Sequence, residues 1–407
     1  MSQPSRPSVS LVIVSRGRPA LLARCLTAVA QMDHPSFEVI VVADPAGLNA
    51  IADRPVKAIA FDEANISQAR NLGIAAAAGE VVAFIDDDAV PEPLWLWHLS
   101  QPFAEADVLV AGGFVLGRNG ISFEWRGGMI NGALEDLPLD EVGGDLSLYA
   151  NHPGRAVEVK GVNCAYRRDV LLSAGGFDPN LHYYLDETEL NLRLAALGGL
   201  TAVVSDARVH HTKAESAQRS ADRVPKTLYD IGFSTAVTLM RHAPSDQIAA
   251  AYTRLRQVEA AKVERFVRAK RLSRQKAQAL LQGYDQGIAA GRALRPAPPV
   301  ALASETLPFR PFPGGPRPLV TLSGRPWRMR SLQRKAGELV RSGHIVRLYV
   351  FSPTALFHRR RFADGVWVQQ GGLFGKSNRS DPLVRFWGFG RRLSRESALF
   401  LSGFRKT

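Results

Sequence analysis

A short apolar run that ends in three aspartates constrains this chain more than any other stretch. Val81–Ile85 are all apolar and rich in β-branched or aromatic side chains. A run this short and this apolar is typical of a strand buried on both faces, as in parallel sheets. Asp86, Asp87 and Asp88 follow at once, and Pro91 is then expected to stop any extension of the strand. Because adjacent carboxylates repel one another, we expect a cation to meet them at the end of this core strand.

The chemistry of three adjacent carboxylates leaves two interpretations open. Open α/β sheets bind their ligands at the carboxyl ends of strands, where this cluster is predicted to lie. Carboxylate oxygens suit Mg²⁺ and Mn²⁺, which often bridge one or two of them to substrate phosphates. The alternative is an acidic turn in water, or an N-cap for a helix that starts at Pro91. These residues alone support both interpretations equally.

Length and charge bound the classes of protein to consider. With 407 residues, the chain is expected to form two or three domains. Residues 301–407 hold 20 Lys and Arg against 5 Asp and Glu, a balance of +15, whereas residues 1–300 balance to −2. Such a basic end suits an anionic membrane or nucleic acid. No apolar run reaches the roughly 20 residues of a membrane span, no secretory signal is recognised, and Cys25 and Cys164 lack metal-ligand spacing.

The start of the chain predicts a right-handed βαβ unit. Ser8–Ser15 and Phe37–Asp44 are predicted as strands, with a helix from Pro19 between them and a shorter third strand at Val56–Phe61. An acidic residue that ends the second strand, here Asp44, commonly hydrogen-bonds the base or ribose of a nucleotide. Neither GxGxxG nor GxxxxGK[ST] occurs, so the sequence supports neither a dinucleotide fold nor a P-loop.

A helix with two polar residues precedes the aspartate-terminated strand. The segment NISQARNLGIAAAAGE ends at Gly79 and carries Arg70 and Asn71, which lie either on an exposed face or against a nucleotide. The βαβ unit ending in Asp44, followed by QARNLGIAAAAGEVVAFIDDD, resembles the nucleotide-sugar-binding half of family-2 glycosyltransferases. The resemblance extends over about residues 8–215.

The resemblance implies an α/β fold of the GT-A type, in which helices flank a Rossmann-like mixed sheet. The three aspartates then stand for the metal-binding DxD motif, with a divalent Mg or Mn ion on Asp88 and Asp86. The side chains that it places against the nucleotide sugar are Ser15, Arg16, Asp44, Arg70, Asn71, Asp86 and Asp87.

A second stretch, Val157–Gly199, resembles the acceptor side of the same family. NCAYRRDVLLSAGGFD matches its loop and helix, and LDETELNLRLAALG takes the place of its E-D-x-D-L-x-x-R helix. The order here is reversed, so register puts Glu187 on the catalytic base while Asp186 competes for that role. Glu189 and Arg193 also form an ordinary i, i+4 pair. Residues expected on the acceptor side are Trp95, Asn163, Glu189 and Arg193.

Two histidines end the next predicted strand, which starts at Leu200. In GT-A enzymes a histidine after the last core strand often completes the metal or diphosphate site. The resemblance therefore points to His210 or His211 as a further metal ligand, and the sequence does not separate them.

Four segments are expected along the chain. They are a catalytic domain (1–218), a helical extension (219–295), a proline-rich linker (296–318) and a basic α/β region (319–407). The basic region opens with a strand, helix and strand that resemble the first unit of a GT-B half-domain. Within the catalytic domain, Pro91–Phe103 is predicted as a helix and residues 118–155 as an irregular flap.

The resemblance implies an inverting, metal-dependent glycosyltransferase. It would move a sugar from a nucleotide-diphosphate sugar to a saccharide or lipid-linked acceptor, in surface polysaccharide or glycolipid assembly. The expected location is the cytoplasm, peripheral at the inner face of the membrane through the basic C-terminal region. One alternative is a nucleotide-sugar-binding protein without turnover, which the reversed Asp186-Glu187 order keeps open. Another is a nucleic-acid-binding protein, which is less favoured because the basic region lacks RNP-type motifs and zinc ligands.

Overall fold

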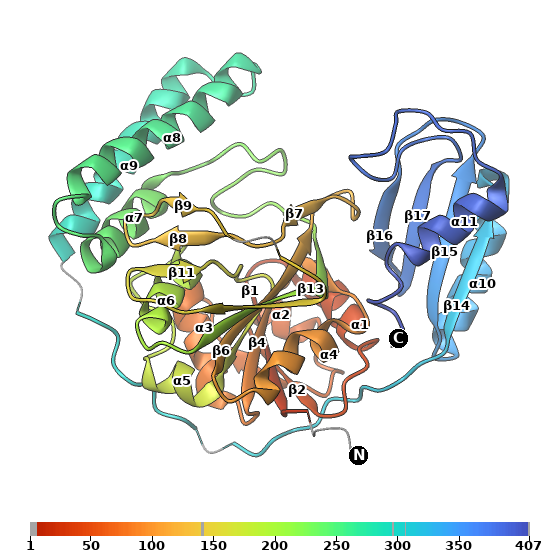
Figure 1. Ribbon diagram of the computed structural model, residues 1–407, viewed down its shortest axis with the longest axis horizontal. Coiled ribbons are helices and arrows are strands. Elements are labelled where there is room, and N and C mark those ends of the chain that lie inside the picture. The colour runs from red at the N-terminus through yellow and green to blue at the C-terminus, as the bar shows by residue number, and fades with distance from the viewer. Residues whose placement is uncertain (1–5, 140–141, 295–296, 306, 406–407) are drawn as a thin grey trace.

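A mixed sheet of ten strands forms the centre of the first half of the chain (Figure 1). The computed structural model describes residues 6–139, 142–294, 297–305 and 307–405. The main strand order is β10-β13-β6-β12-β4-β1-β2-β3, while β5 pairs with β13 and β7 with β6. These strands are β1 (Val9–Ser15), β2 (Phe37–Ala43), β3 (Lys57–Ala60), β4 (Val81–Asp86), β5 (Ala89–Pro91), β6 (Val108–Leu116), β7 (Phe123–Trp125), β10 (Leu146–Ala150), β12 (Cys164–Arg167) and β13 (Leu200–His211).

Strand β4 is buried on both faces because helices cover both sides of the sheet. Val81, Ala83 and Ile85 join one apolar core with helices α1 and α4. Val82 and Phe84 point the other way, into a core with α3, α5 and α6. The helices of this domain are α1 (Pro19–Val29), α2 (Pro45–Asn49), α3 (Ile66–Ala76), α4 (Trp95–Ser100), the 3₁₀ turn η1 (Gln101–Ala104), α5 (Arg168–Ser173) and α6 (Asp186–Ala195). The predicted α/β class, with helices flanking a mixed sheet, is confirmed.

Strand pairing places the turn of Asp86, Asp87 and Asp88 and the end of β13 at the same edge of the sheet. β1 is parallel to β4, and the register sets Val14 beside Asp86. β5 is antiparallel to β13 and sets Ala89 opposite His211. The turn between β4 and β5 therefore lies next to the final residue of β13.

Two segments differ from the sequence prediction. The helix predicted over Pro91–Phe103 begins only at Trp95, because β5 first pairs with β13 and includes Pro91 itself. The predicted flap of residues 118–155 contains short strands, most of which are too brief to leave a pattern in the sequence. Besides β7 and β10, it contributes β8 (Met129–Asn131) and β9 (Asp136–Leu137), and β8 pairs with both β9 and β11 (Arg155–Val157) in a separate small sheet.

Three helices follow the sheet: α7 (Tyr229–His242), α8 (Ile248–Arg268) and α9 (Arg274–Leu294). Glycines let α7 and α9 approach closely, since a Cβ on Gly287 would lie 2.1 Å from the carbonyl oxygen of Tyr229. In Figure 1, α8 and α9 lie side by side and extend away from the sheet. Within the described part of the chain, no helix has the length and apolar character that crossing a bilayer requires.

The predicted proline-rich linker has neither helix nor strand over 297–305 and 307–318. It is held along the first domain by backbone hydrogen bonds. The N–H of Phe312 donates to Phe37 at 2.8 Å, and the N–H of Glu305 donates to Ala75 at 2.9 Å. The linker thus follows the surface of the sheet domain to the C-terminal region (Figure 1).

The C-terminal region forms a second, smaller sheet in the order β14-β15-β17-β16. Its elements are β14 (Leu319–Gly324), the 3₁₀ turn η2 (Pro326–Arg328), α10 (Met329–Arg341), β15 (Ile345–Ser352), β16 (Arg359–Ala363), β17 (Val366–Gly372) and α11 (Phe389–Ala398). Gln31 of the first domain donates to the carbonyl oxygen of Gly365 at 2.7 Å and accepts from the indole of Trp367 at 3.2 Å. The kinship of this region to a GT-B half-domain stays a prediction.

A buried carboxylate fastens helix α7 to helix α6. Glu189 of α6 has no exposed surface and accepts hydrogen bonds from Arg193 at 2.8 Å and from Arg241 of α7 at 2.7 Å. His242 lies 3.2 Å from the same oxygen. Burial alone would raise the pKa of Glu189, but His242, Arg193 and Arg241 outweigh it and lower the pKa to about 2.

Replacing Glu189 with Gln is expected to destabilise the fold by about 3 kcal/mol at neutral pH, because Arg193 and Arg241 lose their shared charge. The carboxylate's contribution is full above its unfolded pKa of about 4.3 and is lost as the pH falls through about 2. Urea unfolding should therefore show a smaller difference near pH 3 than at neutral pH. The control Asp285→Asn, in an exposed pair with Arg256, should change stability by less than about 1 kcal/mol. Equal stability of Glu189→Gln and wild type would contradict this role.

Candidate active site

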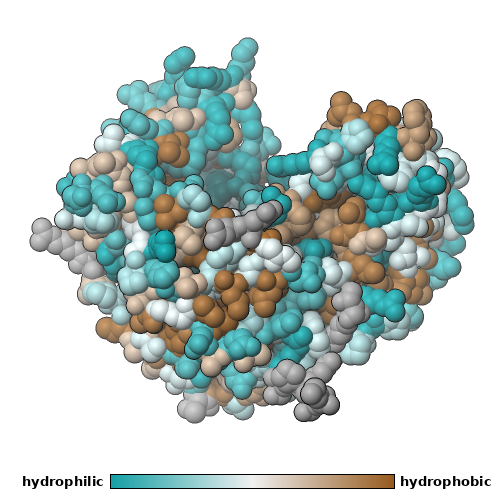
Figure 2. All heavy atoms as spheres, viewed as in Figure 1, coloured by the Kyte–Doolittle hydropathy of each residue, from teal (hydrophilic) through white to brown (hydrophobic). Residues whose placement is uncertain are grey.

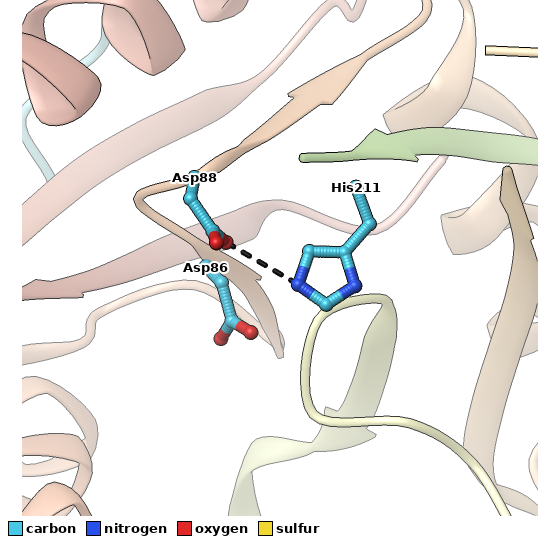
Figure 3. Close-up of side chains that lie close together, drawn as sticks. All are labelled: Asp86, Asp88 and His211. Carbon is cyan, nitrogen blue, oxygen red and sulfur yellow. Dashed lines mark ion pairs between the residues drawn. The ribbon is translucent and has the colours of Figure 1, made fainter. Parts of the chain in front are cut away.

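Two aspartates and one histidine form a cluster that could hold a metal ion (Figure 3). Asp86 ends β4, Asp88 lies in the turn before β5, and His211 ends β13. One ligand atom from each lies within 4.8 Å of the others. His211 Nε2 is 3.3 Å from Asp88 Oδ1. Two carboxylates and an imidazole, without a thiolate, suit Mg²⁺ or Mn²⁺.

Ion pairing favours the charged forms of Asp88 and His211, although the cluster is largely buried. Burial would raise the pKa of Asp88, but His211, the N–H of Ala214 and Arg18 lower it to about 2. Burial likewise opposes the charged form of His211, yet Asp88 and Glu124 raise its pKa to about 9. The histidine therefore carries the positive charge that balances Asp88 when no metal ion does so.

Asp86 is the cluster residue whose negative charge is least balanced by nearby positive groups. Burial raises its pKa, and Arg70 offsets this only in part, while Asp88 adds to the rise. A cation at the cluster would favour the charged form of Asp86.

The middle aspartate has a different role. Asp87 is fully buried and accepts a 2.6 Å hydrogen bond from the hydroxyl of Ser15. Arg18 Nη2 lies 2.6 Å from its other oxygen. Burial raises the pKa of Asp87 to about 7 despite these two partners. Ser15 and Asp87 thus brace the turn from inside, while Arg18, whose side chain is 29% exposed, reaches to 3.8 Å from Asp88.

Arg70 joins the metal cluster to the start of helix α6. Its guanidinium is buried, forms an ion pair with Asp186, and lies 3.3 Å from Asp86. Burial would lower its pKa, but Asp186 and Asp86 raise it above the ordinary value. Gly161 leaves room for this side chain, since a Cβ there would lie 2.6 Å from Arg70 Nη2.

Helix α6 begins with the two predicted acidic residues. Tyr184 and Leu185 precede it with left-handed φ values of 74° and 64°, which side-chain-bearing residues rarely adopt. Asp186 is buried against Arg70, whereas Glu187 is half-buried. Burial raises the pKa of Asp186, and although burial also opposes the charge on Glu187, Arg70 and a hydrogen bond with Asp186 lower the Glu187 pKa. Glu187 is thus the charged, accessible member of the pair.

The remaining residues predicted at the nucleotide side occupy the same edge with mixed roles. Asp44 caps helix α2 by accepting from the N–H of Gly47 at 3.3 Å. Asn71 clamps the backbone of Phe177 with hydrogen bonds of 2.7 and 2.8 Å, which is a structural contact. Arg16 follows β1 and is half-exposed. It forms an ion pair with Asp62, an exposed residue between β3 and α3.

The residues expected on the acceptor side are enclosed in the protein. Trp95 and Asn163 are fully buried, and the indole N–H donates to the Asn163 carbonyl at 2.7 Å. Asn163 in turn donates to two backbone carbonyls, so this pair ties the sheet together. Glu189 and Arg193 hold α6 to α7 and to the backbone before it. The structure gives these residues packing roles and no surface for an acceptor.

The two histidines point to opposite faces of β13, because side chains alternate along a strand. His210 is buried and hydrogen-bonds Glu92 at 2.9 Å, and its ring centroid lies 5.0 Å from that of Trp367 in the C-terminal region. Only His211 joins the two aspartates in the cluster.

Arg18 and Glu124 belong to the site but lie outside the sequence prediction. Glu124, on β7, lies 3.6 Å from His211 Nδ1 and forms an ion pair with Lys213. Burial would raise the pKa of Glu124, yet His211 and Lys213 lower it to about 2. Arg18 follows β1 at the predicted edge, so its position offered a signal. Glu124 lies in a strand of three residues and offered none.

Comparisons with known proteins point in one direction. The family model described as "Glycosyltransferase like family 2" matches residues 6–224. The O-antigen biosynthesis protein RfbC of Myxococcus xanthus is 27% identical over 254 residues, which cover 56% of this chain and 19% of the relative. The glucosyl-dolichyl phosphate glucuronosyltransferase of Haloferax volcanii is 29% identical over 157 residues, 36% of this chain and 47% of that protein. The chain thus spans about a fifth and about half of these relatives' lengths.

A solved structure also resembles this one. It is a mannosyltransferase from Pyrobaculum calidifontis in complex with GDP-Man and Mn²⁺, with a TM-score of 0.41 and 18% identity. The match covers 72% of this chain and 77% of that one.

The cluster generates a direct prediction about metal binding. Titration with Mn²⁺, followed by calorimetry or by the ion's EPR signal, should show one site in wild type. Asp88→Asn and His211→Gln should each weaken it by about tenfold or more, because each removes a ligand. Asp53→Asn and His152→Gln replace exposed residues outside the cluster and should leave the affinity unchanged. Unchanged affinity in Asp88→Asn would place the ion elsewhere.

Proposed function

Because this chain belongs to glycosyltransferase family 2 and has an α/β fold of GT-A type, we propose that it moves a sugar from a nucleotide-diphosphate sugar to a hydroxyl acceptor with inversion. The observation that carries the proposal is the meeting of two groups of side chains at one edge of the sheet. Asp86, Asp88 and His211 form one group. Arg70 joins them to the acidic pair that begins α6.

Asp86, Asp88 and His211 would hold a divalent cation. Bound there, such an ion neutralises the charge that develops on the leaving diphosphate and helps to orient it. Mg²⁺ and Mn²⁺ fit the donor set equally well. Arg18, partly exposed beside Asp88, adds a fixed positive charge on the same side. Arg16 and Asp44 border the place proposed for the nucleoside.

Glu187 is proposed as the general base. It accepts the proton of the acceptor hydroxyl while that oxygen forms a bond to the anomeric carbon. The bond from that carbon to the diphosphate oxygen breaks, and its electron pair leaves with the nucleotide. One displacement from the opposite side inverts the anomeric centre, so no nucleophile from the protein is required. The partial exposure of Glu187 supports this role, and its lowered pKa keeps the carboxylate in the deprotonated form that can accept a proton.

The acceptor and the place of reaction belong to the same proposal. The two relatives are named for O-antigen biosynthesis and for a dolichyl phosphate glycan, which supports a saccharide or lipid-linked acceptor. Such acceptors place the reaction at the inner face of a membrane, with the basic C-terminal region in contact with its surface. A sugar-nucleotide-binding protein without turnover is the rival function, and the test below separates it.

Donor turnover without acceptor tests the function. UDP-, GDP- and dTDP-sugars would be supplied with Mn²⁺ or Mg²⁺, and nucleotide release measured. We expect slow, metal-dependent hydrolysis of one donor, lowered by about 100-fold or more in both Asp88→Asn and Glu187→Gln. Glu187→Gln should still bind that donor, whereas Asp88→Asn should bind it weakly. Asp53→Asn serves as the control, and failure of every donor to bind would refute the proposal.

The assignment of the base has its own test. Asp186→Asn should lower kcat less than Glu187→Gln, because the Asp186 carboxylate is occupied by Arg70. We expect kcat to fall by about tenfold in Asp186→Asn, because Arg70 is displaced. We expect it to fall by about 10²-fold to 10⁴-fold in Glu187→Gln, because the base is lost. Steady-state kinetics with the identified donor and acceptor would measure both variants. A larger loss in Asp186→Asn, with donor binding intact, would exchange the two roles.

A further inference from the structure

Three segments leave the C-terminal sheet at a single edge. β14, β15 and β17 run parallel to one another, so the residues after each strand emerge together. These segments are 325–328, 353–358 and 373–388. β16 is antiparallel to β17 and therefore begins at this edge with Arg359. We call this edge, with its three segments, the apolar tip.

The apolar tip exposes large hydrophobic side chains. Each exposes more than half of its surface, from 52% for Val384 to 85% for Phe386. The set comprises Trp327, Leu356, Phe357, Leu383, Val384 and Phe386. Figure 2 shows apolar side chains gathered on the outer end of the C-terminal region. Clustered exposure of this kind marks a binding surface rather than scattered surface residues.

Ordered contacts hold these side chains outward. The N–H of Gly372 donates to Leu356 at 2.8 Å, and the N–H of Arg385 donates to Phe374 at 3.0 Å. The rings of Phe374 and Phe386 lie 5.4 Å apart. The N–H of Phe374 donates to Thr354 at 3.0 Å, so the two longer segments are fixed to each other as well as to the sheet.

Positive charge surrounds the apolar tip. Its basic residues are Arg325, Arg328, Arg359, Lys376, Arg379 and Arg385. Asp381 is the one acidic residue in the three segments, and it is occupied by Arg395 and by the N–H groups of Ser377 and Asn378. Lys376 lies over the ring of Phe357 at 5.7 Å, which sets a cation beside an exposed ring.

A second basic feature lies on the same side of the molecule. Residues 265–276, around the turn between α8 and α9, contain six Lys and Arg and no Asp or Glu. In Figure 1 the ends of α8 and α9 and the outer end of the C-terminal sheet both lie at the top of the view. Figure 2 shows a hollow between them. The α8–α9 turn and the basic residues of the apolar tip thus lie on either side of a hollow. This arrangement suits contact with a flat anionic surface.

We propose that the apolar tip inserts into an anionic phospholipid membrane while the α8–α9 turn rests on its charged surface. Aliphatic and aromatic side chains with a basic rim combine burial in acyl chains with attraction to lipid phosphates. A second copy of the chain would bring like charges together. Nucleic acid is a poorer partner than a membrane, because Leu356, Leu383 and Val384 cannot stack on bases as aromatic rings do.

Co-sedimentation with vesicles tests this surface in the full chain. The vesicles are phosphatidylcholine alone, or phosphatidylcholine with about one third phosphatidylglycerol. Wild type should bind the anionic vesicles, more weakly as salt rises, and pure phosphatidylcholine weakly. Leu356→Ser with Phe386→Ser should lower the vesicle affinity by at least about tenfold. Arg274→Glu with Lys276→Glu should lower it by about tenfold or more and flatten the salt dependence.

Matched controls separate this surface from general charge and hydrophobicity. Leu197→Ser removes an apolar side chain that is 62% exposed at the end of α6, and should leave binding unchanged. Lys335→Glu with Arg341→Glu reverses two exposed charges on α10 away from the tip, and should reduce binding far less than the α8–α9 variant. Equal loss in controls and tip variants would overturn the proposal. Binding to a DNA or RNA oligomer with no binding to anionic vesicles would also overturn it. Neither outcome depends on glycosyl transfer.

Discussion

One buried guanidinium, that of Arg70, holds the two halves of the candidate site together. It contacts Asp86 on the strand side and Asp186 on the helix side, and Glu187 lies within its electrostatic reach. A single fixed positive charge does not balance three carboxylates in a buried setting. Burial raises the pKa values of Asp86 and Asp186, neighbouring carboxylates add to the rise, and Arg70 offsets it only in part. The arrangement therefore leaves negative charge uncompensated, which suits the proposed cation.

The ribbon formed by β5 and β13 connects this site to the C-terminal region. Its one face carries His211 toward the two aspartates, and its other face carries His210 toward Glu92 and Trp367. Glu92 is fully buried and also lies 3.9 Å from Arg360 of β16. The second sheet thus packs behind the strand that presents a proposed metal ligand.

The sequence predicted best those features that are set locally. An apolar run identifies β4 because each of its faces meets a helix layer, and the aspartates follow directly in the chain. Trp95 and Asn163 are buried and hydrogen-bonded to each other across 68 residues of sequence. No local pattern reveals such a contact. Glu124 reaches the cluster through the pairing of β7 with β6, which no local pattern reveals either, whereas Arg18 directly follows β1 at the predicted edge of the sheet. The choice between His210 and His211 depends on the pairing of β13 with β5, a three-residue strand whose last residue, Pro91, the sequence had assigned to the start of a helix.

Helix geometry explains how the reversed acidic pair leaves one carboxylate partly exposed. Successive residues on an α-helix point about 100° apart, so only one of two neighbours can face Arg70. At the first position of α6 that residue is Asp186, whose short side chain is enclosed by the guanidinium. Glu187 follows at the second position, where its longer side chain is partly exposed. Both lie in the first turn, where the helix dipole favours negative charge. In the proposed assignment, the reversal leaves the shorter Asp186 to hold Arg70 and the longer Glu187 to accept the proton of the acceptor hydroxyl.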